Sequence, residues 1–463
     1  MNDISDLFRM AAEEAAAYRT SLSDRGVAAA PDLDRLRAAF GDDLPGRPAE
    51  PADVLRQLVT AAEPGLVSTA GPRFFGFVIG GALPAASAAE IVATGWDQCA
   101  FNTVLSPAAM AVEERAGVWL KELLGLPSGA STGFVTGAQE ANTVGLAAAR
   151  HHLLSELGWD VERDGLMAAP RVRVVASAER HATIDRSLRL LGFGDAVVES
   201  VDTGSNGAID VQDLARVIEA GPTGPLLVCL QAGNVNTGAC DDLRSACDIV
   251  RRHGGWVHVD GAFGLWAAAS PRTRHLVDGL DLADSWGCDG HKWLNVPYDC
   301  GFVFCSRPAV HQAAASYAAA YLVGSGRLAT AGADLTLQSS RRAHGFAVWA
   351  ALKELGREGV VDLVDRCCLL ARRFADALVT AGVEVANEVV LNQVLASFGS
   401  DDDTDRVIAA VQEGGICWLG GTTWRGRRYM RVSVSNWATT EGDVDRSVAA
   451  ILEAHRVTVT TTR

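Results

Sequence analysis

The chain has 463 residues, and its 56 acidic side chains outnumber its 41 lysines and arginines, which gives a formal net charge of −15. A chain of this length can bury a core without disulfides or metal ions, and a prior of roughly 150 residues per domain allows about three domains. The acidic balance and the absence of a dense Lys/Arg block argue against nucleic acid as a partner.

Residues 1–105 are expected to form a helical segment that packs against a larger body. Apolar residues recur with helical spacing over 4–21 and 52–62, and the stretch 71–84 is rich in glycine and proline, as in an extended packing arm. The start of the chain lacks the features of a secretory signal, and the apolar stretch 74–89 is too short and too broken to span a bilayer. The sequence therefore predicts a cytoplasmic protein with no membrane partner.

Residues 106–340 are expected to form a large α/β domain. Short apolar or β-branched runs alternate with helical stretches, which is typical of a mostly parallel sheet wrapped by helices on both faces. A doubly wound sheet of this kind places its ligands at the carboxyl ends of its strands. The expected strands are 171–176, 226–230, 256–259 and 301–304, and the expected helices include 139–154 and 243–253.

Residues 341–463 are expected to form a smaller α+β domain. Its patterns are helical except for one alternating run that is typical of a half-buried strand. The expected helices are 341–355, 361–381 and 440–455, and the expected strand is 429–435.

The ten cysteines and ten histidines offer possible metal ligands. The cysteines occur singly or as the adjacent pair Cys367 and Cys368, and neither CxxC nor HExxH spacing is present. The sequence therefore predicts no metal site.

Only three of the basic residues are lysines. Lys121 and Lys353 lie in amphipathic helical patterns, where a solvated lysine is expected. Lys292 lies in a segment that looks irregular, just before the strand expected at 301–304. A primary amine can form an imine with an aldehyde, which a guanidinium cannot. On its own, Lys292 is either such a nucleophile or an ordinary salt-bridged lysine.

Three other features could carry chemistry. Asp260 follows the strand expected at 256–259, where it either faces a ligand or caps a turn. The small-residue turn at 133–142 opens a helix, and its N–H groups could bind a phosphate. His181 is an isolated histidine, and by default such a residue is a satisfied structural group.

These features, in this order, closely resemble the group II pyridoxal-phosphate decarboxylases of fold type I, the family of aromatic-amino-acid and glutamate decarboxylases. The resemblance rests on His291-Lys292-Trp293 with Val259-Asp260-Gly261-Ala262 upstream, and it extends from the run at 72–77 to the run at 431–435. It implies a fold type I enzyme with a large PLP-binding domain, a small C-terminal domain, and a homodimer whose active sites are shared between subunits.

The resemblance also implies roles for individual residues. Lys292 would hold pyridoxal 5′-phosphate (PLP) covalently, and Asp260 would pair with the pyridine nitrogen so that the ring acts as an electron sink. His181 would stack on the ring and help to orient the substrate carboxylate. The other implied cofactor contacts are Ala262 on the opposite ring face, Ala138, Gln139, Ser285 and His291 at the phosphate, and Asn234 as a polar contact to the ring.

The activity that the resemblance implies is α-decarboxylation of an amino acid to an amine and CO₂. Phe77, Val78, Cys99 and Phe101 match the side-chain pocket of the aromatic members, which favours an aromatic or apolar substrate, although the phenylalanines could simply be packing residues.

One departure from the family bears on the product. Many members carry a loop tyrosine that protonates the carbanion, whereas the matching interval 322–342 contains no tyrosine. The alternatives are therefore an aldehyde synthase, which couples decarboxylation to oxidative deamination, another PLP enzyme such as an aminotransferase, or a non-catalytic homologue. The last of these would have no need for an imine-forming Lys292.

Overall fold

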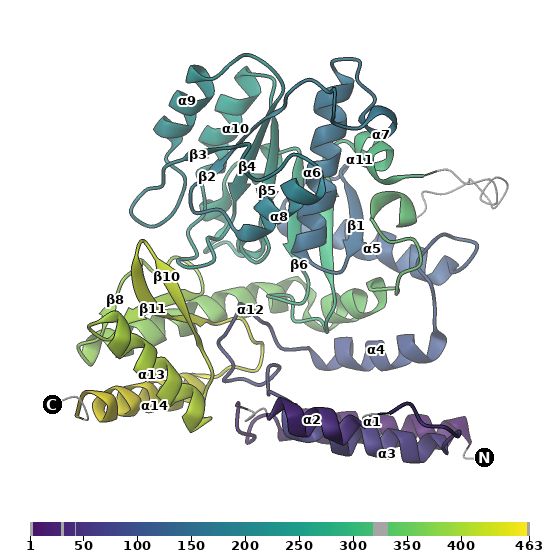
Figure 1. Ribbon diagram of the computed structural model, residues 1–463, viewed down its shortest axis with the longest axis vertical. Helices are drawn as coiled ribbons and strands as arrows, with labels where there is room; N and C mark the ends of the chain where they lie inside the picture. Colours follow the sequence, from purple (N-terminus) through teal and green to yellow (C-terminus); the bar gives the residue numbers. More distant parts are fainter. Residues whose placement is uncertain (1–2, 29–31, 42, 318–331, 461–463) are drawn as a thin grey trace.

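A seven-stranded sheet forms the centre of the computed structural model, which describes residues 3–28, 32–41, 43–317 and 332–460 (Figure 1). The strand order is β1-β7-β6-β5-β4-β2-β3. Strands β2 to β6 pair in parallel, and β7 runs antiparallel to its neighbours β1 and β6. The predicted mostly parallel sheet is confirmed. The strands are β1 (Ser131–Val135), β2 (Arg173–Ser177), β3 (Val198–Val201), β4 (Leu226–Gln231), β5 (Trp256–Asp260), β6 (Ser285–Asp289) and β7 (Gly301–Cys305).

The prediction of an irregular segment before Lys292 is wrong, because this segment forms strand β6. All five residues of β6 are buried between its neighbours β5 and β7. A strand buried on both faces lacks the alternation of apolar and polar residues that identifies a half-buried strand. Gly287 is required by close packing, since a Cβ there would lie 2.4 Å from Asn142 Oδ1.

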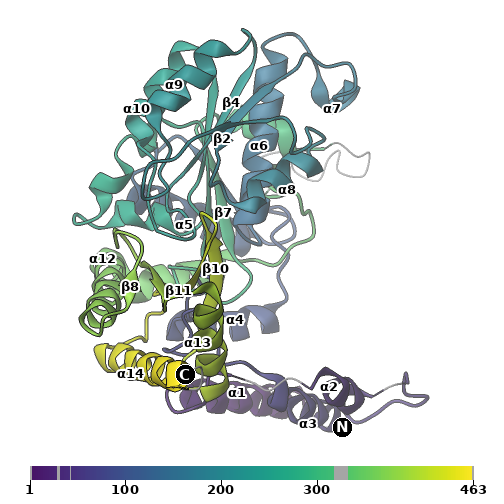
Figure 2. The ribbon, with the colours of Figure 1, turned by 60° about the vertical axis from the view of Figure 1, so that its left-hand side comes forward.

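Helices cover both faces of this sheet (Figure 2). Leu146 of α6 and Ile184 of α8 belong to a hydrophobic cluster on one face, whereas Leu214 of α9 and Leu243 of α10 belong to the cluster on the other. The sheet is therefore doubly wound, as predicted. The helices around it are α5 (Pro107–Leu124), α6 (Ala138–Ser155), α7 (Val161–Asp164), α8 (Ala182–Leu190), α9 (Val211–Ala220), α10 (Leu243–Arg252) and α11 (Pro308–Ala315), with 3₁₀ turns η2 (Gly264–Ala269), η3 (Arg274–Val277), η4 (Leu280–Leu282) and η6 (Gly332–Leu335).

A second, antiparallel sheet with strand order β10-β11-β9-β8 lies in the C-terminal part of the chain. The two helices predicted at 341–355 and 361–381 form one element, α12, which is interrupted at Gly356, where φ is 59°. The domain boundaries at 105/106 and 340/341 stay predictions. The elements of this part are α12 (Gly345–Thr380), β8 (Glu384–Val385), β9 (Gln393–Ser397), α13 (Asp401–Gly414), β10 (Gly420–Trp424), β11 (Arg427–Ser433) and α14 (Glu441–Thr460).

The N-terminal helices α1, α2 and α3 lie side by side at the foot of the molecule (Figures 1 and 2). Within the described chain α1 buries none of its residues, and Ile4 and Phe8 on it are exposed. None of the helices in the described ranges combines the length and the apolar character that crossing a membrane requires. The N-terminal elements are α1 (Ile4–Ser21), α2 (Leu33–Phe40), α3 (Pro51–Ala62), η1 (Glu63–Gly65) and α4 (Pro84–Trp96).

A buried ion pair joins α5 to the segment that leads into α12. Arg341 donates from Nη1 and Nη2 to the two carboxylate oxygens of Glu113, at 2.7 and 2.6 Å. Both side chains are at most 5% exposed. Removing one partner of such a pair leaves an uncompensated charge in the core, and this costs more than the intact pair contributes.

We therefore expect Arg341→Met to destabilise the protein by about 3–5 kcal/mol. The double variant Glu113→Leu/Arg341→Met should recover much of the loss, because no charge is then left buried. The exposed pair Arg357–Glu122 offers a control, and Arg357→Met should cost about 0–1 kcal/mol. Thermal unfolding of the wild type and the three variants measures the order of their stabilities. Equal effects of Arg341→Met and Arg357→Met would contradict it.

Candidate active site

A cavity of about 520 Å³ lies at the carboxyl ends of β4, β5 and β6. Parallel sheets bind ligands at this edge, because the loops that leave the strands there diverge and expose backbone groups. Nine of the predicted site residues line the cavity, namely Phe77, Val78, Ala138, Gln139, His181, Asp260, Ala262, His291 and Lys292. The structure therefore brings together residues from the packing arm, the start of α6, the start of α8 and the ends of β5 and β6.

Four predicted site residues lie elsewhere. Ser285 is the first residue of β6, at the end of the strand remote from the cavity, and its hydroxyl contacts Trp256 Nε1 at 3.0 Å and His258 Nδ1 at 2.9 Å. Asn234 is buried in its own turn, where Oδ1 accepts from the backbone N–H of residues 236 and 237. Cys99 and Phe101 follow α4 and lie outside the cavity of their own chain.

Lys292 pairs with a residue that the sequence analysis missed. Its Nζ lies 2.8 Å from Asp289 Oδ2, and the Asp289 side chain is only 3% exposed. Asp289 is the last residue of β6, so the misassignment of that strand hid it. The one feature of the sequence that could have indicated this pair is an acidic residue three positions before the lysine.

Asn295 fixes the turn that carries Lys292. Its Oδ1 accepts from the backbone N–H of Gly81 at 2.6 Å and of Trp437 at 3.0 Å, and its Nδ2 donates to Ser435 O at 2.9 Å. The packing arm passes directly over this turn, since a Cβ on Gly80 would lie 1.9 Å from Lys292 O. The lysine is thus held by segments from both ends of the chain.

Asp260 is a buried carboxylate with neutral donors. Its Oδ1 accepts from Ala262 N at 3.2 Å, and its Oδ2 accepts from Thr183 Oγ1 at 3.4 Å. Across the described residues, no basic side chain lies within ion-pair distance of it. Its negative charge can therefore serve a cationic group of a ligand, such as a protonated ring nitrogen.

His181 is the N-cap residue of α8, and this position sets its tautomer. Nδ1 accepts from the backbone N–H of Thr183 at 3.3 Å and lies 2.8 Å from the Thr183 hydroxyl. Nδ1 therefore carries no proton in the neutral ring, which leaves Nε2–H as a donor. Burial lowers the pKa of His181, and the charges of Lys292 and Arg431 lower it further, whereas Asp260 opposes them.

Arg431 is a second residue that the sequence analysis missed. It lies on β11 of the small sheet and lines the cavity. Its Nη1 donates to Val235 O at 3.2 Å, and within the described residues it has no carboxylate partner. Burial lowers the pKa of Arg431. A half-buried guanidinium without a counter-ion is suited to bind the carboxylate of a ligand.

The first turn of α6 forms the end of the cavity that is suited to bind an anion. Its N-cap residue, Gly137, offers no side chain to the N–H groups of the turn. His291 lies against it, since a Cβ on Gly137 would be 2.9 Å from His291 Cε1. The His291 ring accepts from Cys300 N through Nδ1 at 3.1 Å, and burial lowers its pKa. A helix N-terminus attracts anions such as phosphate.

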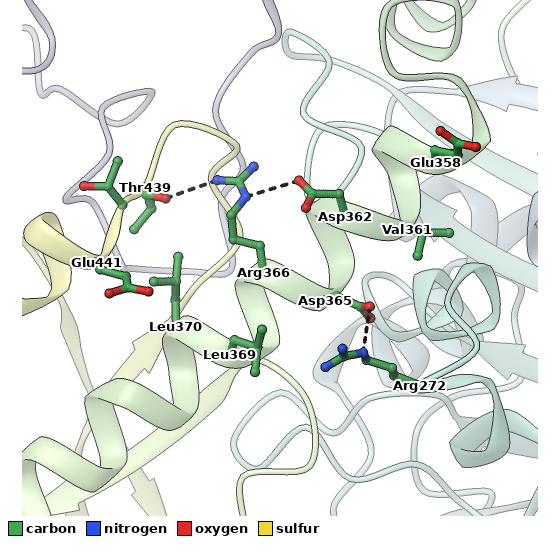
Figure 3. Close-up of a pocket in the computed structure, with 11 residues that line it drawn as sticks. Arg272, Glu358, Val361, Asp362, Asp365, Arg366, Leu369, Leu370, Thr439 and Glu441 are labelled. Atoms are coloured by element: carbon green, nitrogen blue, oxygen red, sulfur yellow. Dashed lines mark hydrogen bonds and ion pairs between the residues drawn. The ribbon is translucent and has the colours of Figure 1, made fainter.

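Another cavity of about 520 Å³ lies between α12 and the turn before α14 (Figure 3). Arg366 there lies 3.5 Å from Asp362 and donates to Thr439 O, and Arg272 lies 3.3 Å from Asp365. Both guanidinium groups therefore already have carboxylate partners. Across the described residues, no cluster of three or more His, Cys, Asp or Glu side chains is placed to hold a metal ion.

The residues at the strand ends fit the cofactor that the sequence resemblance implies. An aldehyde needs the amine of Lys292, a pyridinium nitrogen needs an unpaired carboxylate such as Asp260, and a phosphate needs a helix N-terminus such as that of α6. One group opposes the fit, because the carboxylate of Asp289 lies at the phosphate end. The cavity volume suits a small cofactor together with an amino acid.

Comparisons with known proteins agree with this chemistry. The family model described as "Pyridoxal-dependent decarboxylase conserved domain" matches residues 34–398. Tryptophan decarboxylase 1 of Oryza sativa subsp. japonica is 28% identical over 380 residues, which cover 76% of this chain and 72% of the relative. Phenylacetaldehyde synthase of a Rosa hybrid cultivar is 28% identical over 354 residues, which cover 73% of this chain and 68% of the relative.

A solved structure agrees in fold. The crystal structure of Oryza sativa TDC with PLP and tryptamine matches with a TM-score of 0.91 over 98% of both chains, at 23% identity. Because the family model covers most of the sequence and the cavity holds the groups that the cofactor needs, the chain belongs to the pyridoxal-dependent decarboxylase family of PLP enzymes.

Proposed function

We propose that this enzyme removes the α-carboxyl group of an aromatic or apolar L-amino acid and releases an amine and CO₂. One observation carries the proposal: a lysine amine, an unpaired carboxylate and an unpaired guanidinium face the same cavity. These three groups match the aldehyde of the cofactor, its ring nitrogen and the carboxylate of an amino acid, respectively.

Bound PLP would supply an electron sink for the bond that breaks when CO₂ departs. Lys292 would carry the cofactor, and Asp260 would keep a proton on the ring nitrogen. The N–H groups of Ala138 and Gln139 and the ring of His291 would hold the phosphate, which would compete with Asp289 for the Ala138 N–H group. Binding and activation thus use separate residues.

Two side chains orient the substrate. Arg431 pairs with the α-carboxylate, and the Nε2–H of His181 donates to the same group. Because both side chains are largely buried, their interactions are stronger than they would be in water. Phe263 and Val78 give the cavity apolar walls. Together the contacts of Arg431 and His181 would fix the orientation of the substrate carboxylate in the cavity.

An aromatic surface at the cavity supports an aromatic or apolar substrate. Phe77 stacks on Trp418 with ring centroids 5.2 Å apart, and Phe74 stacks on Trp418 at 4.8 Å. Phe77 lines the cavity and is 63% exposed. Both Phe77 and Val78 have positive φ angles, of 55° and 57°, and such strain is typical of functional sites. The names of the relatives, such as tryptophan decarboxylase, support the same substrate class.

We also propose that the enzyme is a homodimer and acts in the cytoplasm. Cys99 and Phe101 match the substrate pocket of the family but lie outside the cavity of their own chain, so they are candidates to line the site of the partner. The exposed apolar residues of α1 offer a contact surface for that partner. All ten cysteines are free thiols, as is usual in a reducing compartment.

If Lys292 carries the cofactor, borohydride reduction of the holoenzyme should attach the cofactor irreversibly to Lys292. Peptide mapping by mass spectrometry checks the position. Lys292→Ala should lose both the label and the activity, whereas Lys121→Arg and Lys353→Arg should keep them. Label on Lys121 or Lys353 would refute the assignment.

If Asp260 keeps the ring nitrogen protonated, Asp260→Asn should still bind PLP but lose orders of magnitude in kcat, because a neutral amide cannot stabilise the positive charge. PLP binding is followed by absorbance, and turnover by CO₂ release. Asp281→Asn makes the same change in net charge on an exposed residue and should keep normal turnover. A normal rate for Asp260→Asn would exclude the electron-sink role.

A second candidate function is an aldehyde synthase, which converts amino acid, O₂ and water to aldehyde, CO₂, ammonia and peroxide. The lack of a tyrosine over 322–342 favours it, and residues 322–331 of that interval lie outside the described residues. We propose that the amine is the main product, because His181 can protonate the carbanion directly or through water.

The amine, the aldehyde, CO₂, ammonia and peroxide should therefore all be quantified with the best substrate. We expect peroxide to be negligible. The protonated fraction of His181 grows as the pH falls toward its lowered pKa, so amine formation should become faster in that direction. His181→Asn should reduce the amine and raise the peroxide. Stoichiometric peroxide from the wild-type enzyme would favour the aldehyde synthase instead.

A further inference from the structure

Asp289 is a buried carboxylate that the proposed reaction does not use. It ends β6, lines the cavity and is 3% exposed at its side chain. Its two oxygens have different partners: Oδ2 lies 2.8 Å from Lys292 Nζ, and Oδ1 accepts from the backbone N–H of Ala138 at 2.5 Å. The Nε2 atom of His291 also lies 3.4 Å from Oδ1.

These contacts place Asp289 at the anion-binding end of the cavity. Ala138 is the first residue of α6, an 18-residue helix whose N-cap, Gly137, has no side chain to satisfy the first N–H groups. Asp289 supplies that cap from a neighbouring strand. The partial positive charge of the helix N-terminus is therefore already matched by a carboxylate of the chain itself.

The pairing of Asp289 with Lys292 leaves Asp260 without a cation. Two carboxylates end neighbouring strands and face the same cavity, yet only one of them has a charged partner. When the cofactor is loaded, Asp289 loses its cationic partner. The Lys292 nitrogen bonds to the aldehyde carbon, and the aldehyde oxygen leaves as water. The same event brings a phosphate dianion next to Asp289.

We propose that Asp289 is an internal anion which occupies the phosphate end of the site in the cofactor-free enzyme and weakens the hold on the cofactor. The inference rests on the proposed function, because it requires that PLP binds in this cavity. Both effects of Asp289 act in one direction: the Asp289–Lys292 pair stabilises the cofactor-free form, and repulsion between carboxylate and phosphate destabilises the loaded form. Asp289 is thus a positioning residue for Lys292 that also sets the affinity for the cofactor.

The test measures dissociation constants for the cofactor-free enzyme with three ligands. PLP carries both the aldehyde and the phosphate, pyridoxal lacks the phosphate, and pyridoxine 5′-phosphate lacks the aldehyde. Asp289→Asn keeps an oxygen for Ala138 N–H but removes the charge. We expect the dissociation constants of this variant for PLP and pyridoxine 5′-phosphate to be at least about tenfold lower than those of the wild type. This is the size expected when one repulsive contact between two negative charges is removed.

The gain for pyridoxal should be clearly smaller than the gain for PLP, because no phosphate meets the carboxylate. Asp289→Glu keeps the charge and serves as the matched control, so it should bind none of the three ligands more tightly. Asp281→Asn, an exposed carboxylate outside the cavity, controls for net charge and should leave all dissociation constants unchanged.

Thermal unfolding separates this effect from misfolding. Cofactor-free Asp289→Asn should melt below the cofactor-free wild type, because it has lost the ion pair with Lys292, whereas saturating PLP should raise its melting temperature by more than it raises that of the wild type. Weaker or unchanged PLP binding by Asp289→Asn, or an equal gain for pyridoxal, would overturn the inference. A wild-type protein that binds no PLP would overturn the proposed function itself.

Discussion

Parallel pairing of β5 with β6 is the constraint on which the active site depends. The register aligns Asp260 with Gly287, so the two strands end at the same edge of the sheet. Asp260, Asp289 and Lys292 therefore meet in one cavity although they come from separate strands and turns. Gly287 keeps that register possible, because Asn142 leaves no room for a side chain. The helices, the packing arm and the small sheet then add groups around an arrangement that this strand pair has already set.

The charges in the cavity are divided between paired and unpaired groups. Lys292 and Asp289 neutralise each other, whereas Asp260 and Arg431 face the cavity without counter-ions among the described residues. Asp260 is buried and Arg431 is half-buried, and removing an unpaired charge from water costs free energy, so both residues lower the stability of the fold. Asp260 matches a cationic group of a ligand, such as a protonated ring nitrogen, and Arg431 matches a carboxylate. A bound ligand would therefore compensate for the cost of both unpaired charges.

Much of this site could be predicted from the sequence, and the rest depends on tertiary contacts. Strands β2, β4, β5 and β7 have strong apolar runs, and the lysine, the strand-end Asp260 and His181 follow recognisable local patterns. Strand β6 was missed because residues buried on both faces leave no alternation of apolar and polar side chains. Asp289 is distinguished by its pairing with Lys292, and Arg431 by the absence of a carboxylate partner among the described residues. Neither could be predicted, because no local pattern reveals which charges will surround a side chain in the fold.

The hydrogen bonds of Asn295 bear on the order in which the protein matures. This side chain accepts from Gly81 and Trp437 and donates to Ser435, so it connects segments that are hundreds of residues apart. During synthesis the residues around 435–437 leave the ribosome long after the turn of Lys292 has been made. Contacts of such high sequence separation close late, because the chain must first lose the entropy of the intervening loop. The support of the Lys292 turn is therefore completed only late in folding, and in a nascent chain this lysine lacks the contacts that orient it.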